Sequence, residues 1–337
     1  MVSIPPANRI PSCCFFSAVR KSIVPTSRSS LLRAPKLALI VLGLALTTAA
    51  AWPKARLFAV WLTGRNDGCS LTASLDSHEE LLRFTRYKDG LDAVSHILQR
   101  EPSGFELVDT PRGQYWNSRH EPLMGFLLAE QETQIYGDPL HGVRPGDIVL
   151  DCGADIGVFT RTALFRGAKT VVAIEPAPAS VAALRRTFER EIADGRVIVY
   201  PKGVWDKDDM LDLEISDGGT MSGSSFVAHD QRRPTKVRVP LTTIDKMVAE
   251  LQLPRVDFIK MDIEGSEKPA LRGGAETIRK FHPRMALSTE HLPDDSVAIP
   301  RTVNTIWAGY AYQPTDASCK DEFLSITSNV LLFRPKQ

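Results

Sequence analysis

The feature that most constrains the fold is a glycine-bearing turn between two apolar segments. Residues 148–150 read Ile-Val-Leu, and Asp151-Cys-Gly153-Ala-Asp155-Ile-Gly157 follows directly. An apolar segment with helical spacing then begins at Val158. A strand that leads through such a turn into a helix is typical of open α/β sheets, which bind ligands at the carboxyl ends of their strands. The turn therefore predicts an α/β domain with a binding site beside it.

Strand-like and helix-like segments alternate throughout the rest of the chain. Besides residues 148–150, we expect main strands at 171–174, 197–200, 256–261 and 285–288, with helices between them. This alternation predicts a mostly parallel sheet with crossover helices. The apolar segments 323–326 and 330–333 predict a closing antiparallel hairpin, which mixed sheets allow. The expected fold class is a Rossmann-like α/β sandwich.

The charges of the turn indicate which ligand it binds. It lacks the G-x-G-x-x-G pattern that places a pyrophosphate on a helix N-terminus, and Asp151 and Asp155 would repel a diphosphate. These acids suit an ammonium group or hydroxyls, as in S-adenosylmethionine. Gly153 allows close approach of the backbone to a ligand, and Gly157 allows tight packing of helix and strand. Glu175 follows the second strand, where an acid accepts hydrogen bonds from ribose hydroxyls.

We therefore expect Asp151, Gly153, Asp155, Gly157 and Glu175 to bind the cofactor. The alternative for the aspartates is that an acid only caps the following helix. Gly203 and Trp205 follow the third strand, at the edge that reaches an adenine in this fold. Trp205 either stacks on the adenine or packs into the core.

A second group of polar residues follows the later strands. Lys260, Asp262 and Glu264 alternate at a strand end and can share one face, whereas Glu267 also fits a helix start. Glu290 and His291 follow the next strand. We expect Asp262, Glu264, Glu290 and His291 to be the catalytic residues, on the acceptor side, with Asp262 also near the cofactor.

A hydroxyl acceptor must lose its proton, so one member of this group is expected to act as a general base. Asp262, Glu290 and His291 are the alternatives. A divalent cation held by Asp262 and Glu264 would serve the same purpose. No third ligand is evident from the spacing, so we expect a base without a metal.

Several of these segments occur in an order that resembles the FkbM family of S-adenosylmethionine-dependent methyltransferases, from about Tyr136 to Phe333. They are the glycine turn, Ile-Glu-Pro-Ala-Pro, Lys-Met-Asp-Ile-Glu-Gly-Ser-Glu and Ser-Thr-Glu-His. The resemblance implies a class I methyltransferase fold with a mostly parallel, seven-stranded sheet, and usually O-methylation of a hydroxyl. It places Asp151, Gly153, Gly157 and Glu175 at the cofactor. The family often has Asn where this chain has Asp155.

The first 66 residues differ in character from the rest, because no acid precedes Asp67. Leu37–Trp52 is an apolar run of about 16 residues, slightly shorter than the roughly 20 that span a bilayer. It is a membrane anchor, a cleaved signal or transit peptide, or an extension without effect on the fold. The flanking basic residues favour an exported domain, but the cofactor is made inside cells. We therefore expect the cytoplasmic side, with an organelle as the alternative.

Composition limits the remaining functions. The net charge of +1 does not favour nucleic-acid binding. The five cysteines include no CxxC pair, so we expect reduced thiols rather than disulfides or a zinc site. Residues 67–145 are expected to form a lead-in of helices and a hairpin that covers the site, and residues 146–337 the methyltransferase domain.

The sequence thus favours O-methylation of a hydroxyl on a sugar, glycolipid or polyketide-like small molecule. The alternatives are a non-catalytic, membrane-tethered cofactor-binding protein and an NAD-dependent oxidoreductase. The loop Ser216–Gln231 is expected to contribute to the acceptor pocket.

Overall fold

The structure is a computed structural model that describes residue 39 and residues 53–118, 124–215 and 235–336. The chain divides into two units, Met1–Ala51 and Trp52–Gln337, and the following concerns the second. Within the described ranges, no helix combines the length and apolar character needed to cross a membrane. The expected anchor, residues 37–52, lies outside these ranges except for Leu39, so it stays a prediction.

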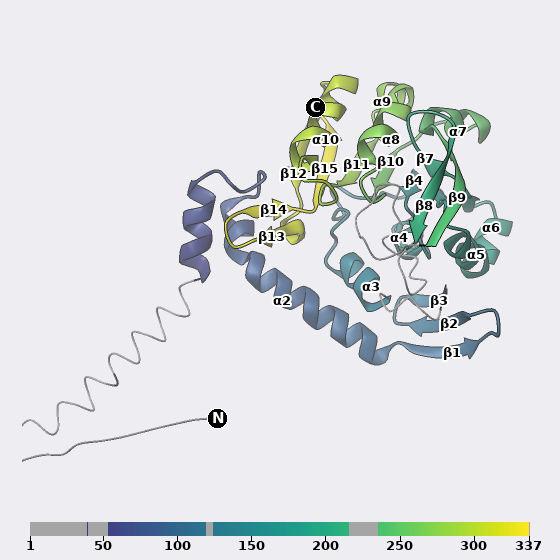
Figure 1. Cartoon of the computed structure of the whole chain (residues 1–337), viewed down its shortest axis with the longest axis horizontal. Coiled ribbons are helices and arrows are strands. Elements are labelled where there is room, and N and C mark those ends of the chain that lie inside the picture. Colours follow the sequence, from purple (N-terminus) through teal and green to yellow (C-terminus); the bar gives the residue numbers. More distant parts are fainter. Residues whose placement is uncertain (1–38, 40–52, 119–123, 216–234, 337) are drawn as a thin grey trace, which may run out of the picture. The chain divides into compact units, whose positions relative to one another are not determined.

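A seven-stranded sheet forms the centre of this unit, in the order β12-β15-β11-β10-β4-β5-β6 (Figure 1). Neighbours from β11 to β6 run parallel, whereas β15 is antiparallel to both β11 and β12. The predicted class I methyltransferase sheet is therefore confirmed. The strands are β4 (Ile148–Cys152), β5 (Thr170–Ile174), β6 (Val197–Tyr200), β10 (Phe258–Met261), β11 (Arg284–Ser288), β12 (Tyr310–Pro314) and β15 (Val330–Pro335).

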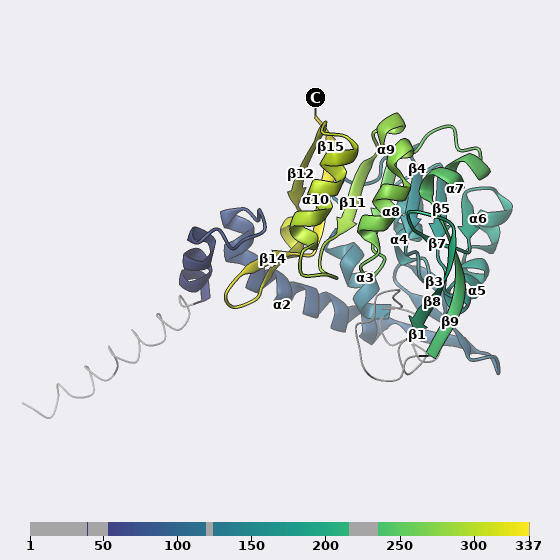
Figure 2. The same ribbon diagram turned by 45° about the horizontal axis from the view of Figure 1, so that its top comes forward.

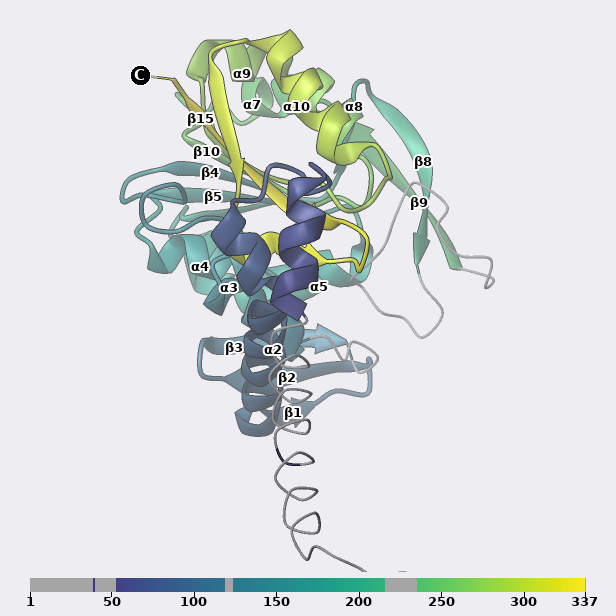
Figure 3. The same ribbon diagram turned by 90° about the vertical axis from the view of Figure 1, so that its left-hand side faces the viewer.

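Helices cover both faces of the sheet, which gives three layers (Figure 3). One face carries α4 (Val158–Phe165), α5 (Pro178–Thr187) and α6 (Glu189–Ala193), and the other carries α7 (Ile244–Glu250), α8 (Glu267–Gly273), α9 (Ala275–Phe281) and α10 (Asp295–Ile306). Successive strand residues point to opposite faces. Val149 joins the cluster under α4, whereas Leu150 joins the cluster under α7 to α10. Burial on both sides explains why these strands are apolar without alternation.

The strand order reverses direction between β4 and β10. From β4 the chain proceeds to β5 and β6 on one side, and the later strands β10 and β11 lie on the other. The loops after β4 and β10 therefore diverge and leave a crevice at their carboxyl ends, which is where doubly wound sheets bind ligands. Both predicted groups of polar residues follow strands that end at this crevice.

The C-terminal antiparallel pair is present, but the prediction of its first strand was wrong. β15 pairs with β12, not with residues 323–326. Phe323 and Leu324 lie in an exposed loop, and Ile326 begins β14 (Ile326–Ser328), which pairs with β13 (Cys319–Asp321) in a separate small sheet. Only Ile326 of this short apolar segment is buried, in a small cluster with Cys69 and Cys319, so the segment does not join the main sheet.

The lead-in consists of α2 (Leu71–Val94), a three-stranded sheet and α3 (Met124–Glu132) (Figure 2). The sheet contains β1 (His96–Arg100), β2 (Phe105–Thr110) and β3 (Gly113–Ser118). The β2–β3 pair is the hairpin that was predicted within the lead-in. Leu128 of α3 packs with Ile156 and Val158, beside the glycine turn. This contact brings α3 to the crevice.

A disulfide connects Cys69, just before α2, with Cys319, the first residue of β13. The prediction of reduced thiols is therefore wrong for these two cysteines. Their separation of 250 residues gives no local spacing signal. Cys152 is free and buried, and Cys13 and Cys14 lie outside the described residues. The disulfide joins the beginning of the lead-in to the β13–β14 hairpin.

Candidate active site

The glycine turn after β4 is held against β5 and β10. The amides of Gly153 and Ala154 both donate to the carbonyl of Ile174, at 3.0 and 3.1 Å. Gly153 has φ +78°, and a Cβ there would lie 1.9 Å from the carbonyl oxygen of Asp262. Only glycine therefore fits between the ends of β4 and β10. Gly157 packs against Phe188 instead, as its predicted packing role requires, and does not border the cavity.

Asp151 lies beneath the turn rather than in the cavity. Its side chain is fully buried, accepts a hydrogen bond from Thr160 at 2.6 Å and lies 3.6 Å from the Nζ atom of Lys260. Lys260 in turn donates to the carbonyl of Gly153 at 2.7 Å. The expected direct contact of Asp151 with a ligand is thus not supported by its position. Asp151 fixes the lysine that supports the turn.

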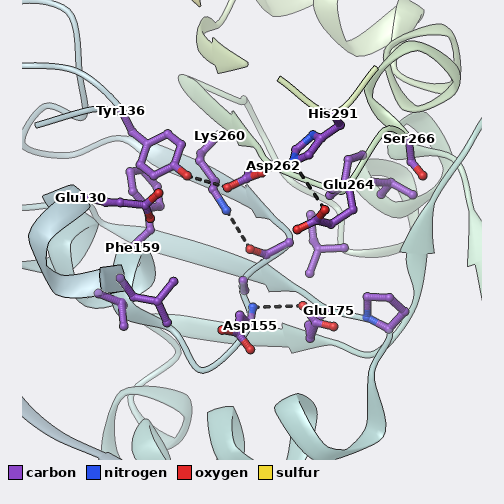
Figure 4. Close-up of a pocket in the computed structure, with 18 of the residues that line it drawn as sticks. Glu130, Tyr136, Asp155, Phe159, Glu175, Lys260, Asp262, Glu264, Ser266 and His291 are labelled. Carbon is purple, nitrogen blue, oxygen red and sulfur yellow. Dashed lines mark hydrogen bonds and ion pairs between the residues drawn. The ribbon is translucent and has the colours of Figure 1, made fainter. Parts of the chain in front are cut away.

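Glu175, immediately after β5, faces the same cavity as the turn (Figure 4). Its carboxylate accepts hydrogen bonds from the amides of Asp155, at 3.0 Å, and Ala177, at 2.8 Å. Burial, reinforced by the charge of Asp155, raises the pKa of Glu175 to about 7. Asp155 has φ +47°, a conformation that is costly for a non-glycine residue and recurs at ligand sites. The expected proximity of the turn and the second-strand acid is present.

A cavity of about 420 Å³ extends from Glu175 to the strand ends of β10 and β11. This volume lies within the range of small-molecule sites. At the first end, which we call the donor end, it is bordered by Gly153, Ala154, Asp155, Ile174, Glu175, Pro176, Gly203, Val204 and Leu213. At the other end, the acceptor end, polar residues predominate: Glu130, Gln131, Tyr136, Lys260, Asp262, Glu264, Glu290, His291 and Lys320.

The two residues predicted at the adenine edge have different positions. Gly203 belongs to β7 (Gly203–Val204), which pairs with β9 (Thr235–Thr242), and it borders the cavity. Trp205 is half-buried, its amide donates to Thr242, and it does not border the cavity. β9 also pairs with β8 (Asp209–Ile215). The loop Ser216–Gln231 lies outside the described residues.

His291 is surrounded by carboxylates at the acceptor end. Its Nε2 atom lies 3.3 Å from Asp262 and 3.6 Å from Glu264, and its Nδ1 atom lies 3.1 Å from Glu267. Burial alone would lower the pKa of His291, but the hydrogen bond to Glu267 and the charges of Asp262 and Glu264 outweigh it and raise the pKa to about 10. Three of the four residues predicted to be catalytic are thus brought together.

The fourth, Glu290, is more exposed and lies at the rim. It pairs with Lys320 at 3.1 Å and accepts a hydrogen bond from Asn329. Glu264 has φ +55°, and burial raises its pKa to about 7. A left-handed glutamate in the cavity wall is a second strained residue at this site.

Sequence reasoning missed two residues of the acceptor end that come from the lead-in. The hydroxyl of Tyr136 donates to Asp262 at 2.5 Å. Glu130 of α3 borders the cavity, and burial together with the charge of Asp262 raises its pKa to about 8. No local motif distinguishes either residue, because Glu130 acquires its position from the packing of α3 and Tyr136 from its contact with Phe159. Lys320 of β13 also lacks a local signal.

Comparison with known proteins agrees with this architecture. Residues 151–311 match the model of the methyltransferase FkbM domain. The chain is 29% identical over 161 residues to 31-O-demethyl-FK506 methyltransferase FkbM of Streptomyces tacrolimicus, covering 40% of this chain and 62% of that protein. It is 27% identical over 151 residues to 2-O-methyltransferase NoeI of Sinorhizobium fredii, covering 41% of this chain and 61% of the relative.

A solved structure, methyltransferase FkbM from Methylobacillus flagellatus KT, aligns with a TM-score of 0.42 and 17% identity, covering 77% of this chain and 61% of that chain. The chain spans about three fifths of the length of the curated relatives it matches. The match begins at the glycine turn and includes the residues of both strand ends that face the cavity. Residues 151–311 of this chain therefore carry a methyltransferase FkbM domain.

Proposed function

We propose that this protein is an S-adenosylmethionine-dependent methyltransferase that methylates a hydroxyl of a sugar, glycolipid or polyketide-like small molecule. The observation that carries the proposal is the hydrogen bond between Glu175 and the amide of Asp155. It joins the glycine turn and the second-strand acid at one cavity. The family match supports methyl transfer, and the names of two relatives, a 31-O- and a 2-O-methyltransferase, support an oxygen acceptor.

The donor end fits an amino-acid nucleoside. Glu175 retains lone pairs for ribose hydroxyls beyond its two backbone partners. Asp155, whose carboxylate accepts a hydrogen bond from Ser180, borders the cavity where an ammonium group would benefit from its charge. Val204 and Leu213 offer apolar surface for a purine. Asp155 and Glu175, which both border the donor end, disfavour the diphosphate of NAD, so the oxidoreductase alternative lacks support.

The acceptor end fits a neutral hydroxyl compound rather than an anion. S-adenosylmethionine supplies an electrophilic methyl group on a sulfonium. The chain's contribution is to hold the acceptor oxygen in line with the methyl carbon and to accept the proton of the hydroxyl. General-base catalysis of this kind accelerates a reaction by about 10²–10⁴-fold. Asp262 and Glu264 project from the loop after β10 into this end of the cavity. Tyr136 fixes the orientation of Asp262 through its hydroxyl.

Binding of the demethylated donor tests the proposal. Isothermal titration of the full chain with S-adenosylhomocysteine is expected to show micromolar binding, with Glu175→Gln weaker by about tenfold. Glu276→Gln, on the exposed side of α9, is the matched control. Methyl transfer from an isotopically labelled donor to a panel of glycans and polyketides would then define the acceptor. Tight NADH binding, or no binding of S-adenosylhomocysteine, would contradict the proposal.

Donor binding without transfer to any member of the panel would instead support the non-catalytic alternative. If the protein is catalytic, substitutions at the acceptor end are expected to lower the rate of methyl transfer and to leave the affinity for S-adenosylhomocysteine unchanged.

A further inference from the structure

Three side chains from the ends of different elements converge beside the acceptor end. Asp262 follows β10, Glu267 begins α8 and His291 follows β11. One donor atom from each lies within 4.8 Å of the donor atoms of the other two. The sequence offered Asp262 and Glu264 as possible ligands without a third. The folded chain supplies Glu267 and His291, and Glu264 lies beside them, 3.6 Å from His291 (Figure 4).

Carboxylates are concentrated around one histidine in this cluster. Asp262, Glu264 and Glu267 surround a single imidazole. The ammonium group of Lys260 donates to the carbonyl of Gly153 and faces Asp151, and its charge also acts on Asp262. Buried carboxylates are costly unless hydrogen bonds, a cation or a proton compensate them.

Glu267 provides an independent indication of a missing partner. Its side chain is fully buried. Its Oε1 atom accepts hydrogen bonds from the amide of Ile263, at 2.9 Å, and faces Nδ1 of His291, at 3.1 Å. Its Oε2 atom has no hydrogen-bond partner within the described ranges. A carboxylate oxygen that is removed from water and unpaired, beside a histidine and a second carboxylate, is suited to a metal ion.

We propose that Asp262, Glu267 and His291 bind a divalent cation, with Glu264 as an additional oxygen donor. Ligands about 2.0–2.4 Å from a common ion are at most about 4.8 Å apart, as these donor atoms are. A set of one imidazole and several carboxylates suits Mn²⁺ or Mg²⁺ more than metals that prefer thiolates. Asp262, Glu264 and His291 border the cavity, so an ion that they hold would be within reach of an acceptor oxygen there.

The role of the cation rests on the proposed function. At this place it would lower the pKa of an acceptor hydroxyl and orient it toward the donor end. The binding site itself can be tested without turnover, so its failure can be distinguished from failure of the proposed function.

Mn²⁺ binding to the EDTA-treated full chain, followed by electron paramagnetic resonance, tests the site. We expect about one ion per chain with a Kd below about 100 μM. Glu267→Gln and His291→Gln are each expected to weaken binding by about tenfold or more. Glu175→Gln is the matched control, because it removes a buried carboxylate from the donor end of the same cavity. It should retain Mn²⁺ but lose affinity for S-adenosylhomocysteine.

Circular dichroism and thermal melting verify that each variant is folded. His291→Gln decides the question if Glu267→Gln does not fold. Absence of Mn²⁺ binding at about 1 mM, or equal binding by folded His291→Gln, would overturn the metal site. If the EDTA-treated wild type still transfers methyl groups at its full rate, the catalytic role falls while the proposed function stands. Mn²⁺ binding without any S-adenosylhomocysteine binding would support the metal site and contradict the proposed function.

Discussion

The two ends of the cavity are built in different ways. The donor end is made by segments close in the sequence, since the turn after β4 and Glu175 after β5 meet through one crossover helix. The acceptor end collects side chains from α3, β10, α8, β11 and β13, which are spread over much of the chain. The donor end is therefore fixed by local backbone geometry, whereas the acceptor end depends on how separate elements pack.

This difference indicates where substitutions are tolerated. A change in the glycine turn strains the sheet itself, because β4 and β10 touch at Gly153. A change at the acceptor end alters one contributor among several and leaves the sheet intact. Substitutions at the two ends are thus expected to differ in kind as well as in size.

The largest effect is expected from Gly153→Ala. The new methyl group would lie 1.9 Å from the carbonyl of Asp262, at φ +78°. Left-handed strain and overpacking together should lower the free energy of unfolding by about 3–4 kcal/mol. Urea denaturation measures this loss. Gly195→Ala is the control, because Gly195 has φ +70° with no atom within 4 Å, and it should cost about 1–2 kcal/mol. Equal losses would show that the strand contact is unimportant.

The second largest effect is expected from removal of the disulfide. Cys69→Ser with Cys319→Ser releases a cross-link between residues 250 apart, which should cost about 3 kcal/mol of unfolding free energy. Thermal melting with and without reductant measures it. Because Lys320 adjoins Cys319 and contacts Glu290, turnover should fall while donor affinity stays within about twofold. A loss of donor affinity would mean that the two ends are not separate.

The sequence brought Gly153, Asp155 and Glu175 to the donor end correctly, whereas Asp151, Gly157 and Trp205 do not border the cavity, and the acceptor end was predicted only in part. Local patterns of apolar residues, glycines and acids predict the positions of residues 148–157 and of Glu175. Asp262, Glu264 and His291 were identified because they follow strands. Glu130 and Tyr136 were not, because nothing in residues 124–136 specifies which face of α3 meets the sheet. The pairing of Cys69 with Cys319 has no local signal at all.

Asp151 shows a further limit of local patterns. Its place in the motif predicted contact with the ligand, but its side chain points to the sheet face that α4 covers and is fully buried there. Thr160 and Lys260 occupy its carboxylate there. A motif thus predicts which residues gather at a turn more securely than which of them reach the cavity.

Glu175→Gln should produce the third effect, about a tenfold loss of donor affinity at pH 8. The pKa of Glu175 is raised by burial to about 7, so its carboxylate gains a proton as the pH falls through neutrality. Only the ionised form accepts two hydroxyl hydrogen bonds freely. Wild-type affinity for S-adenosylhomocysteine should therefore decrease from pH 8 to pH 6, as titration calorimetry can measure. The Gln variant should lack this dependence, and a parallel decrease in both would assign it elsewhere.

The smallest effect is expected at the acceptor end, from Tyr136→Phe. The variant removes the hydroxyl that donates to Asp262 at 2.5 Å but keeps the ring against Phe159. Loss of one hydrogen bond is worth about 1 kcal/mol, so kcat should fall about fivefold. Affinity for S-adenosylhomocysteine should stay within about twofold, because the hydroxyl that is removed donates to Asp262 at the acceptor end. A purely structural tyrosine would lower the melting temperature without this separation. If donor affinity fell as much as kcat, Tyr136 would support both ends, and the division of the cavity into a local and an assembled half would fail.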